Sequence, residues 1–125
     1  EGGVVSIFTR CLQQGEVLTV FGDGSQTRDF IYVGDVAAAN VQAICSRETN
    51  RILNISTQTE NSVNQLIKLL AEISGREIAV ENQAARAGDI LRSMLCSEEA
   101  KKALEWIPAT SFKEGLTRTY WALSK

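Results

Sequence analysis

The chain has 125 residues, 44% of them hydrophobic and 22% charged, with a formal net charge of −2 and no histidine. This composition is ordinary for a globular domain with a sizeable core. It argues against a nucleic-acid-binding surface, which needs a basic face. It also excludes His-assisted nucleophiles and His-liganded zinc within this chain. No apolar run approaches the ~18 residues of a membrane helix, and the first residues lack the pattern of a signal peptide.

The beginning of the chain predicts a helix followed by a short strand. Apolar residues recur on one helical face over residues 4–14, and Gly15 is the expected C-terminal cap. Residues 18–21 indicate a strand. Glycines on both sides of Asp23 then allow a tight reversal with positive φ.

The next segment is expected to continue as strand, helix and strand. Phe30–Val33 has the aromatic and β-branched content of a strand, and Asp35 is a suitable N-cap for an alanine-rich helix over 36–46. Residues 51–56 form a short apolar run typical of a buried strand. Ser62 and Gln65 have capping-box spacing for a helix that ends at Gly75.

The last third of the chain adds a strand and two helices. Alternation over 77–81 predicts a half-buried strand carrying Ile78 and Val80. Ser97 is expected to cap a helix running to Trp106, which Pro108 prevents from continuing. A capping box at 111–114 begins a final helix, whose apolar residues include Leu116, Tyr120 and Leu123. Strands alternating with helices indicate an α/β fold, and we expect both tryptophans, Trp106 and Trp121, in the core.

The cysteines indicate a reducing compartment. Cys11, Cys45 and Cys96 are odd in number, far apart in sequence and set among apolar residues, where a reduced cysteine behaves as a small hydrophobic side chain. We therefore expect a cytoplasmic protein.

Arg28 is the first candidate for a binding residue. It follows the glycine-rich turn, where the backbone can approach a ligand closely, so its guanidinium could hold an anion. A salt bridge to Asp29 or Asp35 is the ordinary alternative, and from the local residues alone it is the more probable one.

A longer pattern changes that balance. The sequence of residues 19–40 is Thr-Val-Phe-Gly-Asp-Gly-Ser-Gln-Thr-Arg-Asp-Phe-Ile-Tyr-Val-Gly-Asp-Val-Ala-Ala-Ala-Asn. This segment resembles the substrate-binding part of extended short-chain dehydrogenase/reductases that act on nucleotide sugars. The resemblance is greatest to the bacterial UDP-glucose 4-epimerase type. Arg86-Ala-Gly-Asp89 is similar to a second element of that family. Residues 1–8, 97–108 and 111–116 also resemble family segments, so the likeness covers nearly the whole chain.

The resemblance implies roles for six residues in binding a UDP-sugar. Arg28 and Arg86 would hold the diphosphate, Asp89 would accept a hydrogen bond from a ribose hydroxyl, and Thr19, Val20 and Phe21 would bracket the uracil. Other interpretations remain open. Arg86 could be a solvated loop arginine, Asp89 a turn residue after Gly88, and Phe21 a core aromatic or a residue with both roles.

The chain lacks two motifs of that family. Neither Gly-x-x-Gly-x-x-Gly nor Tyr-x-x-x-Lys occurs, so we interpret residues 1–125 as a C-terminal nucleotide-sugar-binding domain without catalytic or metal-ligating residues of its own. The resemblance implies that NAD is bound by an N-terminal half outside this chain, and that the full enzyme is a homodimer.

Residues 35–56 are expected to pack on that half. Alone, the chain would then expose apolar surface and be marginally stable or self-associate.

Three alternatives to an epimerase remain. The chain could belong to a 4,6-dehydratase or a decarboxylase on the same scaffold, or it could be a non-catalytic module that binds a nucleotide sugar or a protein. Departures from the family pattern at Gly34, 56–58 and Ser93 leave the sugar and the base open.

Overall fold

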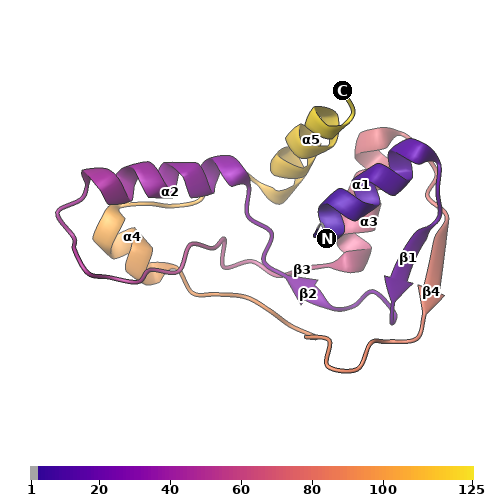
Figure 1. Cartoon of the computed structure of the whole chain (residues 1–125), viewed down its shortest axis with the longest axis horizontal. Helices are drawn as coiled ribbons and strands as arrows, with labels where there is room; N and C mark the ends of the chain where they lie inside the picture. The colour runs from indigo at the N-terminus through magenta and orange to yellow at the C-terminus, as the bar shows by residue number, and fades with distance from the viewer. Residues whose placement is uncertain (1–2) are drawn as a thin grey trace.

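The computed structural model describes residues 3–125. Glu1 and Gly2, which belong to the family-like segment 1–8 and to the predicted domain 1–125, lie outside the described residues. Nine elements follow one another, beginning with helix α1 (Val4–Gln14) and ending with helix α5 (Phe112–Leu123) within the described range. Figure 1 shows two groups of elements joined by long irregular segments. The expected α/β character is confirmed.

The larger group contains three helices and a two-stranded parallel sheet. Strand β1 (Leu18–Phe21) pairs with β4 (Val80–Gln83), α1 packs on β1, and α3 (Val63–Ser74) and α5 pack on α1 and on each other. Their apolar faces form one core of Phe8, Leu12, Leu18, Val20, Val63, Leu66, Leu70, Leu116 and Tyr120. Burial of these side chains is the main stabilising contribution to this group.

The smaller group consists of α2 (Val33–Cys45) and α4 (Glu98–Leu104), which lie side by side in Figure 1. Its core contains Ala39, Ala100 and Trp106. Between the two groups, β2 (Thr27–Arg28) pairs antiparallel with β3 (Asn61–Ser62). None of the helices in residues 3–125 has both the length and the apolar character needed to cross a bilayer.

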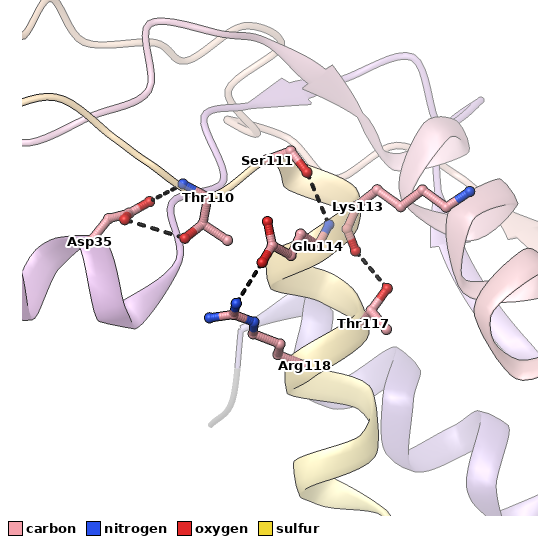
Figure 2. Close-up of polar contacts among 7 residues, drawn as sticks. All are labelled: Asp35, Thr110, Ser111, Lys113, Glu114, Thr117 and Arg118. Carbon is pink, nitrogen blue, oxygen red and sulfur yellow. Dashed lines mark hydrogen bonds and ion pairs between the residues drawn. The ribbon is translucent and has the colours of Figure 1, made fainter.

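The helix ends confirm most of the local predictions. Gly15 and Gly75 adopt the left-handed conformation at the ends of α1 and α3, and Ser62 and Gln65 form a complete capping box. Ser111 caps α5 by accepting from the Glu114 backbone N–H at 3.2 Å (Figure 2), but the Glu114 carboxylate pairs with Arg118 instead of completing a box.

The prediction of a strand at 30–33 and an N-cap at Asp35 is wrong. Helix α2 already begins at Val33 after an extended Tyr32. Asp35 is buried within the first turn, where it accepts hydrogen bonds from the backbone N–H and the hydroxyl of Thr110 (Figure 2). Its negative charge still suits the helix N-terminus, but its carboxylate holds another part of the chain.

Two more strand predictions need correction. Residues 51–56 form no strand, and Ile52 is fully exposed, since no strand among the described residues pairs with this segment. The strand predicted at 77–81 lies at 80–83, and its residues are all exposed instead of half-buried.

Several side chains also differ from expectation. Trp106 is buried, as predicted, although α4 ends before it at Leu104 and the Ser97 side chain makes no cap. Trp121 is 53% exposed, so the prediction of a core role was wrong. Cys11 is half-buried, whereas Cys45 and Cys96 are exposed and therefore do not act as core side chains.

Candidate functional site

A rigid turn connects the two strands that carry Phe21 and Arg28. Gly22 and Gly24 have φ values of 86° and 80°, as predicted for this reversal. A Cβ at Gly24 would lie 2.1 Å from Oδ1 of Asn64, whose backbone N–H and side-chain amide donate to Gly24 O and Asp23 O. Glycine at position 24 is therefore required by both conformation and space. Hydrogen bonds from the hydroxyl and backbone N–H of Ser25 lower the pKa of Asp23.

Arg28 is held against the segment that follows β4. Its Nη1 donates to the carbonyl oxygens of Thr27 (2.7 Å) and Ile90 (2.6 Å), and its Nη2 donates to Oδ1 of Asp89 (3.2 Å). The Arg28 and Asp89 side chains are 32% and 35% exposed. Among residues 3–125, the Nε–H and the second Nη2–H of Arg28 take no partner, which leaves donors that could hold an anion.

The alternative prediction for Arg28, a salt bridge to Asp29 or Asp35, is wrong, because both carboxylates have other partners. Asp29 accepts hydrogen bonds from Thr57 and Gln58, and Asp35 accepts from Thr110. Arg28 does form a salt bridge, but with Asp89, another residue of the predicted site.

Arg86 lies over the ring of Phe21, with the guanidinium carbon 3.6 Å from the ring centroid. This is a cation–π contact at the end of β1. Beside it is a cavity of about 440 Å³ lined by several α1 residues together with Thr19, Val20, Phe21 and Arg86. Thr19 and Phe21 are half-buried, whereas Val20 is 1% exposed and belongs mainly to the core.

The Arg86–Asp89 element is a turn that connects these two contacts. The Asp89 N–H donates to Arg86 O at 3.2 Å, and Gly88 has a positive φ of 81°. The turn places Arg86 against β1 and Asp89 against β2. The six predicted residues therefore lie on β1, β2 and one adjoining loop, as one candidate anion and base site.

Sequence reasoning missed a neighbouring polar cluster centred on Glu60. The Thr27 hydroxyl donates to Oε1 of Glu60 at 2.6 Å, and Arg92 donates to both carboxylate oxygens, at 3.1 and 2.5 Å. Glu60 and Arg92 are 32 residues apart, and no local pattern marks them as partners. The hydrogen bonds from Arg92 and then Thr27 lower the pKa of Glu60 from 4.5 to about 2.

This shift gives a pH prediction. Because the pKa of Glu60 is lower in the folded chain, its interactions contribute stability above pH 4.5, and that contribution is lost as the pH falls through about 2. In carbon-detected NMR titrations, the Glu60 carboxyl should titrate near pH 2, and Arg92→Ala should raise its pKa toward 4.5. A Glu60 carboxyl that already titrates near 4.5 before substitution would contradict this arrangement.

Two features of the described residues bear on NAD and metal binding. The 22–24 turn joins two strands and opens no helix, so it lacks the form of a dinucleotide-binding turn. Within the described residues, no group of three or more cysteine, aspartate and glutamate side chains is placed to hold a metal.

The sequence of the chain is similar to those of known nucleotide-sugar enzymes. A model of the NAD dependent epimerase/dehydratase family matches residues 1–56. A putative UDP-glucose 4-epimerase of Methanocaldococcus jannaschii is 42% identical over 119 residues, which cover 94% of this chain and 38% of the relative. UDP-glucuronic acid decarboxylase 1 of Xenopus tropicalis is 36% identical over 121 residues, which cover 95% of this chain and 28% of the relative.

Comparison with solved structures also finds a UDP-glucose 4-epimerase. The crystal structure of a Thermotoga maritima UDP-glucose 4-epimerase with UDP-glucose superimposes with a TM-score of 0.90 and 42% identity, over 98% of this chain and 40% of that one. The chain thus spans about two-fifths of the length of these relatives and matches the C-terminal part of their Rossmann-type fold. These findings confirm the predicted resemblance of the chain to the NAD-dependent epimerase/dehydratase family.

Proposed function

We propose that this chain binds the nucleotide of a UDP-sugar in an epimerase of the UDP-glucose 4-epimerase type, while C4 of the sugar is oxidised and re-reduced. The observation that carries the proposal is the 86–89 turn, which sets Arg86 on Phe21 and Asp89 on Arg28. Arg28 and Arg86 would hold the diphosphate, and Asp89 the ribose. Thr19, Phe21 and the main chain of Val20 would contact the uracil.

The hydrogen bonds of Arg28 support an anchoring role. Its Nη1 is fixed by two carbonyl oxygens, so the guanidinium plane is already oriented. The Nε–H and an Nη2–H on its other edge can take two phosphate oxygens at once. Among the described residues, Asp89 accepts the Arg28 hydrogen bond through Oδ1 alone. Its Oδ2 can therefore accept a hydrogen bond from a ribose hydroxyl.

Binding the nucleotide tightly also suits the chemistry of a 4-epimerase. The sugar has to rotate between the oxidation of C4 and its reduction, so the site cannot bind the sugar tightly. Affinity must then come from the remote, non-reacting nucleotide. In this proposal the residues of this chain bind and orient, and NAD and the catalytic side chains belong to an N-terminal half of the full protein.

An apolar face on α2 supports packing of residues 35–56 on that half. Val33, Val41 and Ile44 are 72%, 60% and 84% exposed, and Ile52 beyond the helix is fully exposed. Large apolar side chains gathered in this way usually mark an interface. The relatives are long enough to include such a partner domain.

The exposed face leads to a prediction for the isolated 125 residues. We expect them to self-associate, because water-exposed apolar area favours association. Gel filtration with light scattering should show species larger than a monomer, increasing with concentration. A stable monomer at high concentration would contradict packing of residues 35–56 on a partner domain.

Product analysis of the full protein tests the activity. Incubation with NAD and UDP-glucose should give the 4-epimer of the same mass. Loss of carbon dioxide from UDP-glucuronic acid would instead support the decarboxylase alternative, which the Xenopus relative favours, and loss of water would support a 4,6-dehydratase. Binding of UDP-sugars without turnover would indicate a non-catalytic module. Homodimer assembly and a cytoplasmic location are further parts of the proposal.

A further inference from the structure

The loop that carries Arg86 and Asp89 has no buried side chain to anchor it. All residues from 84 to 92 are exposed, and the next buried side chain is Ser97. In Figure 1 this stretch runs from β4 to α4 along one edge of the molecule without helix or strand. Its position must therefore depend on polar contacts with the elements that it crosses.

Most of those contacts reach β2 and Glu60, which directly precedes β3, and Arg86 also lies on the Phe21 ring of β1. The Thr27 N–H donates to Leu91 O at 2.8 Å, and Arg28 reaches Ile90 O and Asp89. One residue further along, Arg92 donates to both carboxylate oxygens of Glu60. Glu60 also accepts from the hydroxyl of Thr27, so it joins the loop to β2.

We propose that Glu60 is a positioning residue for the nucleotide site: through Arg92 and Thr27 it holds the 86–92 loop on β2 and so places Arg86 and Asp89. This inference rests on the proposed function of those two residues. Glu60 itself is not expected to touch the nucleotide.

Glu60 suits this role because its contacts are separate from those that a ligand would use. The bond between Arg28 and Asp89 joins two of the proposed ligand-binding residues, so a bound nucleotide would contact both ends of that link between β2 and the loop. The Glu60–Arg92 pair involves none of the proposed ligand-binding residues and can remain intact. Glu60 is only 21% exposed in its side chain and has three donors on its two oxygens, which fixes its geometry.

The test measures UDP affinity by calorimetry in the full protein. We expect Glu60→Gln and Arg92→Ala each to weaken UDP binding about tenfold, the usual order for loss of an outer partner that orients a ligand-binding group. Arg92→Lys should recover part of that loss, because it restores one charged contact. The matched control is the Glu72–Lys113 pair, which links α3 and α5 at 3.1 Å; Glu72→Gln and Lys113→Ala should bind UDP normally.

A double-variant cycle separates positioning from a general loss of stability. If Glu60 acts through the loop, Glu60→Gln should cause a smaller loss in an Arg86→Ala background than it causes alone, because one of the two groups that it places is already absent. A fully additive loss would overturn the positioning role. Hydrogen exchange should also become faster at the amides of Thr27 and Asp89 in Arg92→Ala.

The outcomes distinguish the two proposals. Wild-type protein that does not bind UDP would overturn the proposed function and this inference with it. Wild-type protein that binds UDP while Glu60→Gln and Arg92→Ala bind equally well would overturn this inference alone. The Arg92 side chain is 79% exposed, so we expect Arg92→Ala to fold. UDP binding by Arg92→Ala therefore tests the positioning role even if Glu60→Gln fails to fold.

Discussion

Replacing Arg28 with alanine is expected to weaken UDP binding by roughly 1.5–3 kcal/mol, or about 10- to 150-fold. The substitution removes the donors available to a diphosphate and also the Nη1 bonds to Thr27 O and Ile90 O. It therefore acts on the anion contact and on the position of the loop together. Isothermal calorimetry with UDP measures the effect directly.

Two further variants show whether the loss of UDP affinity comes from the guanidinium of Arg28. Arg28→Lys should restore only part of the affinity, because an ammonium group cannot hold two carbonyl oxygens and a diphosphate with a planar fork. Arg51→Ala is the matched control, since Arg51 also pairs with carboxylates, of Glu48 and Glu99, but outside the proposed site. Normal UDP binding by Arg28→Ala would rule out the anchor role.

Replacing Trp106 with alanine should lower the free energy of unfolding by about 3–5 kcal/mol. Trp106 is 2% exposed and is the only large side chain among the buried members of the smaller core, with Ala39 and Ala100. Its indole Nε1 also donates to Asp35 O at 2.9 Å, which ties the segment after α4 to α2. Denaturant unfolding followed by circular dichroism measures the loss, and hydrogen exchange should show it first in α2.

Trp121→Ala is the matched control for that experiment. Trp121 is 53% exposed and makes an edge contact with Tyr120 at 5.1 Å between ring centroids. Its replacement should change the free energy of unfolding by less than about 1 kcal/mol. Equal losses for the two tryptophans would contradict the division between a buried and an exposed residue.

Features determined by neighbouring residues could be predicted from the sequence. The Ser62–Gln65 capping box and the glycines that end α1 and α3 depend on interactions within one turn, and all were found where expected. The positive φ values at Gly22 and Gly24 follow in the same way from local turn chemistry. The family-like segments over 19–40 and 86–89 added the fold and the candidate site residues.

Features that depend on distant partners could not be predicted. Residues 51–56 have the composition of a buried strand, but they lack a neighbouring strand in the described chain and leave Ile52 exposed. Asp35 looked like a helix cap because nothing nearby reveals Thr110 as its partner. The Arg28–Asp89 and Glu60–Arg92 pairs join residues 61 and 32 positions apart, and only the folded chain brings them together.

The most direct test of the nucleotide site is an NMR spectrum of the labelled protein with and without UDP. UDP should shift the backbone amides of Phe21, Arg86 and Asp89 and the side-chain Nε–H of Arg28. The amides of α4 and the indole N–H of Trp121 should stay unchanged. A well-dispersed spectrum in which UDP leaves the Arg28 Nε–H and the 86–89 amides unmoved would contradict the assignment of these residues to a nucleotide.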